Sequence, residues 1–394
     1  MNCPLRIAFT LLLLTATVLY GDKPNLVYIM LDDAGYGDFS CYGQEKFKTP
    51  NIDRMASEGM RLTNFYSGST VCAPARCSLM TGLHTGHCQV RGNREVQPEG
   101  QAPLAPGTVT LPMILSKGGY KTGMFGKWGL GAPGSISDPA NHFDKFYGYN
   151  CQRQAHTYYP KHLWNNRTKV PLDGKTYAHS LISDEALKFI RKNHKKPFFA
   201  YIPITIPHAA MQAPESYVAP FRKKFPEFED KIGRDSHGTR VKNPVAAFAG
   251  MMTLVDEDIG HILKLLKELK IEKNTFVLLT SDNGPHMEGG HQPAGGQGDS
   301  KGKGKDKGNK GKCEQFCDSL ENVEDEKFSC VMAINADQEN EPASGCNLQG
   351  ATYNACSEDW NEQICLCARH LYEEGEGPCE NSAQCVAGLQ CFLN

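Results

Sequence analysis

Short apolar runs are spaced along residues 22–291 and predict buried strands. Residues 25–31, 197–204 and 275–280 are almost entirely apolar and rich in β-forming side chains. Runs of this length and composition are typical of strands that are covered on both faces of a parallel sheet. The first part of the chain therefore predicts a sheet whose central strands are buried.

Helix-like segments lie between these runs. A helix is predicted at residues 184–193, and a longer one from Pro244 to Leu269, where apolar residues recur at helical spacing. Another is predicted after Thr49, with Pro50 at its first position and Gly59 just past its end. Strands that alternate with helices predict an α/β fold, a mostly parallel sheet sandwiched by helices.

Polar residues follow three of the predicted strands. Asp32 and Asp33 come directly after the first, His208 follows the second, and Asp282 and Asn283 follow the third. The carboxyl ends of strands are where open α/β sheets bind ligands, and carboxylate and amide oxygens suit calcium or magnesium. Ordinary solvated loop residues are the alternative for each of them taken alone.

The first 21 residues have the pattern of a secretory signal peptide. Arg6 is followed by an apolar run from Ile7 to Leu19, too short to span a bilayer comfortably. A membrane anchor is the alternative, because the residues around Gly21 do not form a small-x-small cleavage site. No later segment predicts a stable membrane span.

The composition changes after residue 291. Residues 292–312 are rich in Gly and Lys and predict a flexible linker, with a polyanion-binding tail as the alternative. Residues 313–394 hold ten of the sixteen cysteines and predict a small module joined by disulfides; a metal site at Cys365 and Cys367 is the weaker alternative. The formal net charge of -2 gives no general electrostatic case for nucleic acid.

Cysteine usage and the signal peptide together predict the secretory pathway, ending outside the cell or in a lysosome-like compartment. Asn166 is a candidate glycosylation site. Besides Cys72, residues 22–291 contain Cys41, Cys77, Cys88 and Cys151, which could form two bridges or stay reduced.

Three motifs carry a resemblance to a known family. Cys72-Ala73-Pro74-Ala75-Arg76 is followed by Thr81-Gly82, and the segments "GYKTGMFGKWGLG" (119–131) and "SDNGPH" (281–286) come later in the chain. Together they resemble the signatures of the sulfatases, over about residues 22–291. The resemblance implies a sulfatase or alkaline phosphatase-like fold and a catalytic domain that stops short of the family's C-terminal subdomain.

The resemblance also implies a modified residue and a metal. Cys72 would be oxidised to formylglycine by the formylglycine-generating enzyme, and one hydroxyl of the hydrated aldehyde would attack the sulfur of a sulfate ester. One calcium ion would be held by Asp32, Asp33, Asp282, Asn283 and the modified Cys72. The implied activity is hydrolysis of sulfate esters of aryl or carbohydrate alcohols.

Three further residues match positions of the family's active site. Arg76 and Lys127 would stabilise the attacking hydroxyl and the sulfuryl oxygens. His208 would contact sulfate and help to protonate the leaving oxygen. Most sulfatases carry, where this chain has Gly129, the histidine that acts as base when sulfate is ejected; some similar sulfatases share the glycine. We expect His156 to replace that base, and a cleft-lining role is the alternative.

A second departure lies after the "SDNGPH" segment. Related sulfatases soon reach a lysine in a "K-x-x-x-YEGG"-like motif, whereas here the sequence runs into the Gly/Lys segment. Two interpretations follow: a secreted sulfatase, or a catalytically impaired sulfatase-like binding protein or chimeric gene product. The intact motif at Cys72 favours the enzyme.

Overall fold

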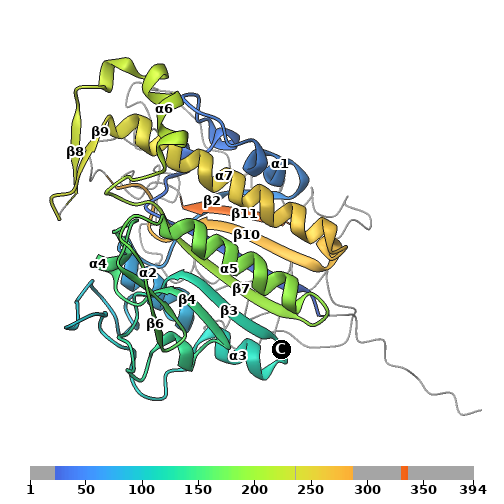
Figure 1. Cartoon of the computed structure of the whole chain (residues 1–394). Coiled ribbons are helices and arrows are strands. Elements are labelled where there is room, and N and C mark those ends of the chain that lie inside the picture. Colours follow the sequence, from blue (N-terminus) through green and yellow to red (C-terminus); the bar gives the residue numbers. More distant parts are fainter. Residues whose placement is uncertain (1–22, 236, 287–329, 336–394) are drawn as a thin grey trace, which may run out of the picture.

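The computed structural model describes residues 23–235, 237–286 and 330–335. A nine-stranded sheet lies at its centre, in the order β2-β11-β10-β1-β7-β3-β4-β5-β6 (Figure 1). Neighbours from β2 to β4 are parallel, and β5 and β6 extend one edge in antiparallel pairing. The mostly parallel α/β fold is confirmed. The strands are β1 (Asn25–Asp32), β2 (Met60–Phe65), β3 (Lys121–Lys127), β4 (Lys145–Tyr149), β5 (His162–Asn165), β6 (Thr168–Pro171), β7 (Phe198–Pro207), β10 (Thr275–Ser281) and β11 (Cys330–Asn335).

The three predicted strands are β1, β7 and β10, neighbours at the centre of the sheet. Strand β7 continues to Pro207, three residues beyond the predicted end, because Asp32 pairs with Pro207 after a bulge. This extension carries the chain to His208 at the edge where β1 ends.

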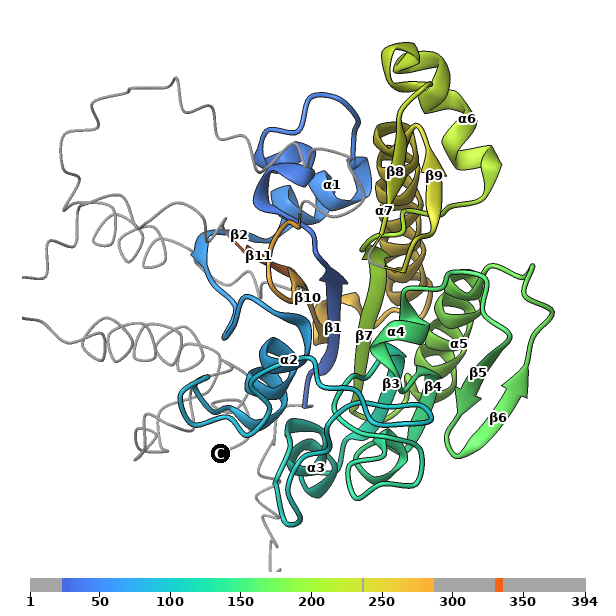
Figure 2. The same cartoon turned by 90° about the vertical axis from the view of Figure 1, so that its left-hand side faces the viewer.

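Helices cover both faces of the sheet, with α1, α5 and α7 on one face and α2 and α3 on the other (Figure 2). Two of the predicted helices are confirmed as α1 and α7. The prediction for residues 184–193 was wrong at its start, because the helix begins at Ala178, and Ala178, Ile182 and Ala186 share one buried face. The helices are α1 (Pro50–Glu58), α2 (Cys72–Thr81), α3 (Leu111–Lys117), α4 (Gln152–Ala155), α5 (Ala178–Asn193), α6 (Glu215–Lys224) and α7 (Pro244–Glu268).

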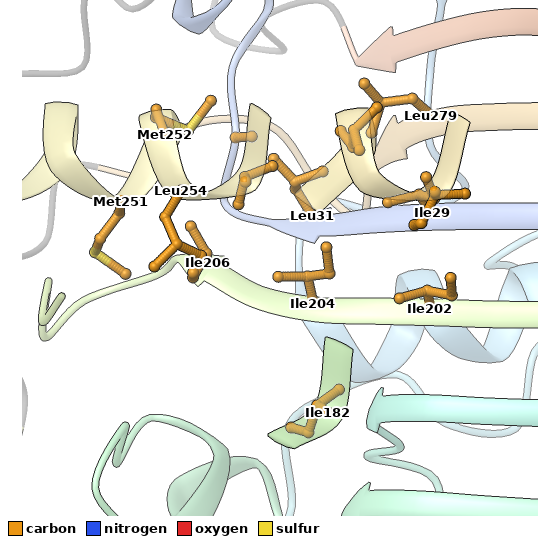
Figure 3. Close-up of a cluster of buried hydrophobic side chains, with 14 of the residues drawn as sticks. Ile29, Leu31, Ile182, Ile202, Ile204, Ile206, Met251, Met252, Leu254 and Leu279 are labelled. Carbon is orange, nitrogen blue, oxygen red and sulfur yellow. The ribbon is translucent and has the colours of Figure 1, made fainter. Parts of the chain in front are cut away.

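Alternate residues of β1 build the two cores, as expected for side chains that point to opposite faces. Ile29 and Leu31 pack under α7 (Figure 3), whereas Tyr28 and Met30 face the layer that contains α2 and α3. Every residue of β1 is buried. The central strands are therefore held from both sides, which makes their carboxyl ends a rigid platform.

A small hairpin stands apart from the central sheet. Its strands β8 (Ile232–Arg234) and β9 (Arg240–Lys242) are antiparallel and lie between α6 and α7 in the chain. Among the helices that the structure describes, none has the length and apolar character needed to cross a membrane.

Strand β11 falls within residues 313–394, the predicted cysteine-rich module, and lies in the central sheet between β10 and β2. The other residues of that range lie outside the described part of the chain. The same holds for the predicted signal peptide (1–21) and linker (292–312). These assignments, and the limits of the predicted catalytic domain, stay predictions.

Candidate functional site

Two pairs of polar residues meet at the carboxyl ends of β1 and β10. The strands are parallel neighbours, so Asp32 and Asp33 emerge beside Asp282 and Asn283. The backbone N–H of Asp33 donates to Asp282 Oδ1 at 3.3 Å, and Asn283 Nδ2 donates to Asp33 Oδ1 at 2.7 Å. The predicted convergence of these four residues is present, although about 250 positions separate the pairs.

Cys72 reaches the same point from the first residue of α2. Val71 caps the helix in an extended conformation, and the N–H of Ala73 donates to Asn93 Oδ1 at 3.0 Å, which fixes the first turn. The Cys72 side chain is buried, with Sγ 3.4 Å from Asp32 Oδ1. Ligand atoms of Asp32, Asp33, Cys72 and His208 all lie within 4.8 Å of one another.

The environment of Cys72 keeps its thiol protonated. Burial raises the pKa of Cys72 well above its ordinary value, and the negative charge of Asp32 adds to this effect. Nucleophilic cysteines instead need a lowered pKa, because the thiolate is the reactive species. As a plain thiol, Cys72 is therefore poorly suited both to attack and to metal binding.

Two buried cations surround the carboxylates. Arg76 Nη2 lies 2.8 Å from Asp282 Oδ2, and Lys127 Nζ lies 2.5 Å from Asp32 Oδ2. Arg76 Nη1 also donates to the carbonyl of Lys127 at 2.7 Å, which ties α2 to the end of β3. Burial opposes the ionisation of Asp32, but the neighbouring cations, above all Lys127, outweigh it and hold the pKa of Asp32 well below its usual value.

Carboxyl groups outnumber the buried basic side chains in this cluster. Asp32, Asp33 and Asp282 surround Arg76 and Lys127. Burial and the charge of Asp32 raise the pKa of Asp282 to about 8. An additional cation would favour the ionised form of Asp282 and lower that pKa.

The donor set fits a hard divalent cation. Asn283 Oδ1 is buried and has no hydrogen-bond partner among residues 23–286. Carboxylate and amide oxygens are the ligands that calcium prefers, whereas zinc favours thiolates and imidazoles. Because Cys72 is held as a thiol, the ionised ligands of the cluster are oxygens.

Two histidines close the other side of the site. The His156 and His208 rings are stacked, with centroids 3.6 Å apart. His208 Nε2 lies 3.2 Å from Asp33 Oδ2, and its Nδ1 contacts the carbonyl of Ala209, so both ring nitrogens face an oxygen. Burial, then the charge of Lys127, holds the pKa of His156 well below its ordinary value. Its neutral Nε2 accepts from Lys127 Nζ at 3.2 Å.

Known proteins resemble this chain over about two thirds of its length or more. The family model for sulfatases matches residues 24–313. This chain belongs to the sulfatase family. It is 30% identical over 303 residues to N-acetylgalactosamine-6-sulfatase of Rattus norvegicus, covering 70% of the chain and 52% of that protein. It is also 30% identical over 289 residues to an arylsulfatase of Hemicentrotus pulcherrimus, covering 68% of this chain and 48% of that protein.

Solved structures support the alkaline phosphatase-like sulfatase fold. A crystal structure of Ps i-CgsB has a TM-score of 0.58 and 27% identity, covering 68% of this chain and 60% of that one. The sulfatase spans about half the length of the curated relatives that it matches. The predicted departure from the family's lysine motif concerns residues after 286, of which the structure describes only 330–335.

Every predicted site residue of the sulfatase lies in this one cluster, but two neighbours were missed. Asn93 holds the first turn of α2, and the His237 ring lies 6.1 Å from that of His156. Neither residue belongs to a motif or follows a predicted strand. No pattern in the sequence marked them, because long-range packing places them at the site.

The backbone and the surroundings of Gly129 disfavour any side chain at this position of the sulfatase. Gly129 has φ 75°, which disfavours any side chain, and a Cβ there would lie 2.8 Å from Gln152 Nε2. Gln152 begins the short helix α4, and His156 follows its last residue. The same helix therefore fills the space beside residue 129 and delivers an imidazole to Lys127 from a different element.

We predict that Gly129→Ala lowers the free energy of unfolding more than Gly134→Ala does. Both glycines have φ 75°, but nothing lies within 4 Å of a Cβ at Gly134. The cost of holding alanine at a positive φ, about 1 kcal/mol, is then common to both variants. Any further loss of unfolding free energy in Gly129→Ala measures the contact with Gln152. Denaturant unfolding would check this, and equal losses would contradict it. Adding Gln152→Ala to Gly129→Ala is expected to recover this further loss.

Proposed function

We propose that this chain is a formylglycine- and calcium-dependent hydrolase of sulfate esters of aryl or carbohydrate alcohols. The observation that carries the proposal is the position of Cys72 Sγ, 3.4 Å from Asp32 Oδ1 and within 4.8 Å of ligand atoms of Asp33 and His208. A carbohydrate ester is favoured, because one relative is an N-acetylgalactosamine-6-sulfatase and another similar protein was crystallised with k-i-k-neocarrahexaose.

Asp32, Asp33, Asp282 and Asn283 would hold the calcium ion, together with the side chain at position 72. When bound, the ion supplies positive charge for the sulfate oxygens and for the carboxylates. It would also favour the ionised form of Asp282, whose pKa is raised by burial and by the charge of Asp32. The buried, unpartnered Asn283 Oδ1 is available as a ligand oxygen.

The side chain at position 72 would supply the nucleophile after oxidation to formylglycine, a hydrated aldehyde with two hydroxyls. Arg76 and Lys127 hold that side chain between fixed positive charges, since both are buried and anchored to Asp282 and Asp32 respectively. Charges that are already oriented need no rearrangement as negative charge develops on sulfate.

The two histidines are suited to opposite proton transfers. His208, with both ring nitrogens facing oxygen acceptors, is set to carry a proton for the leaving oxygen. His156 is held neutral by burial and Lys127, so its Nε2 can accept a proton from the hydroxyl at position 72.

An impaired, sulfate-binding protein is the second candidate function. It is favoured by the sequence after residue 286, which lacks a recognisable "K-x-x-x-YEGG"-like motif. Activity separates the two candidates, because the impaired protein would bind sulfate esters without turnover.

Hydrolysis by the secreted full-length chain tests the proposal. We expect a fluorogenic aryl sulfate to be cleaved by the wild type and the rate to fall by more than about 10³-fold in Cys72→Ala. Mass spectrometry of the tryptic peptide 62–76 is expected to show aldehyde at position 72. An intact thiol, together with activity no higher than in Cys72→Ala, would refute the enzyme assignment.

Calcium is expected to stabilise the folded chain through the acidic cluster. At about 100 times its Kd, calcium should raise the melting temperature by roughly 5 °C relative to chelator-treated protein. Asp33→Asn is expected to abolish this shift, since it removes a ligand charge. Asp144→Asn serves as the control, because this partly exposed carboxylate pairs with Lys121 away from the cluster. A shift that survives in Asp33→Asn would place the calcium elsewhere.

His156→Ala is expected to lower kcat by about 10²- to 10⁴-fold. Product alcohol should appear in one burst equal to the enzyme concentration before turnover stalls, because only the later, sulfate-releasing step needs this base. In the wild type, the lowered pKa of His156 keeps its ring neutral under mildly acidic conditions, so the acidic limb of kcat should lie below pH 6.5. His162→Ala is the control, since His162 pairs with Glu99. Unchanged burst and turnover in His156→Ala would remove His156 from the mechanism.

A further inference from the structure

A pair of buried cysteines lies behind the nucleophile position. Cys77 is in α2 and is fully buried, and Cys88 lies in the loop that follows the helix, with 1% of its surface exposed. The two thiols are hydrogen-bonded to each other. Cys88 Sγ also lies 3.3 Å from Ser78 Oγ and 3.8 Å from Thr81 Oγ1. The loop thus returns to the helix and places the sulfur of Cys88 against that of Cys77.

Helix geometry separates this pair from Cys72. Five residues along an α-helix correspond to a rotation of about 140°, so Cys72 and Cys77 point in different directions. Cys72 faces Asp32, whereas Cys77 and Cys88 pack in the apolar layer with Met80. The thiol to be oxidised to an aldehyde is therefore kept apart from the other two.

Further polar contacts hold the sulfur of Cys88 in place. Its Sγ also donates to the carbonyl of Leu83 at 3.0 Å. The hydrogen bond with Cys77 lowers the pKa of Cys88, and the same bond, together with burial, raises the pKa of Cys77. Loss of the proton from either thiol therefore leaves a thiolate in contact with the other sulfur.

We propose that Cys77 and Cys88 form a disulfide in the mature protein. During folding, before the loop 82–88 packs against α2 and buries both sulfurs, the thiolate of Cys88 attacks one sulfur of an external disulfide, either a disulfide-bearing oxidoreductase or glutathione disulfide, and releases one thiolate. Cys77 then loses its proton and attacks Cys88 Sγ in the mixed disulfide, which releases the second thiolate. The pair loses two electrons and two protons, and the external disulfide is reduced to two thiols. The inference does not depend on the proposed hydrolase activity.

The bridge would fasten the loop 82–88 to the last turns of α2. The first turn of this helix is already fixed by Asn93, and Arg76 by Asp282. A covalent link at the other end would leave α2 constrained along its whole length, with Cys72 as the one cysteine of the helix outside the bridge.

Peptide mapping tests the proposal directly. Trypsin cleaves after Arg76 and Arg91, so both cysteines fall in the peptide 77–91, while Cys72 falls in a separate one. Protein secreted from an oxidising pathway is denatured in N-ethylmaleimide and digested without reductant. We expect peptide 77–91 with two hydrogens fewer than the dithiol and no added maleimide, and two maleimides only after reduction. Two maleimides before reduction, or either cysteine linked to a different one, would overturn the proposal.

Stability provides the second measurement. Reductant is expected to lower the melting temperature of the wild type by roughly 5 °C in excess of its effect on Cys77→Ser/Cys88→Ser. Cys41→Ser is the matched control and should respond to reductant as the wild type does. If the double variant fails to fold, the wild-type peptide map alone decides. A reductant effect of equal size in the wild type and the double variant would contradict the bridge.

Discussion

Buried charge at the end of the central strands is the constraint on which the site depends. Asp32, Arg76, Lys127 and Asp282 are almost completely withdrawn from solvent, and each is tolerable there only because of the others. The ion pairs join β1, β10, α2 and the end of β3, so the four elements can take only one arrangement. The same pairing leaves Asp33 and Asn283, joined by a hydrogen bond, beside the ion pairs.

Most of the central fold could be predicted from the sequence. The strands β1, β7 and β10 are uninterrupted apolar runs because both of their faces are covered, and such runs are recognisable without knowledge of their neighbours. The start of α5 was misplaced. Ala178 and Ile182 lie among polar residues in the sequence, and their shared apolar face appears only once the helix is formed. The position of β11 in the sheet had no local signal, because its pairing with β10 is a long-range contact.

The meeting of the site residues could be predicted for a different reason. Asp32 ends β1, and Asp282 and His208 follow β10 and β7, so the topology of a parallel sheet brings them together. By contrast, the reason for glycine at position 129 is the side chain of Gln152, and the approach of His156 to Lys127 depends on the short helix α4. These relations depend on the packing of two loops, which no periodicity encodes.

The burial of Cys72 sets a time limit on its chemistry. Arg76, four residues after Cys72, pairs with Asp282, which is synthesised 210 residues after Cys72. At ordinary rates of translation this interval lasts roughly 10–40 s. Any enzyme that acts on the thiol has that interval, and whatever delay folding adds, before β10 docks beside β1. A change that speeds this docking would shorten the time for which the thiol of Cys72 is accessible.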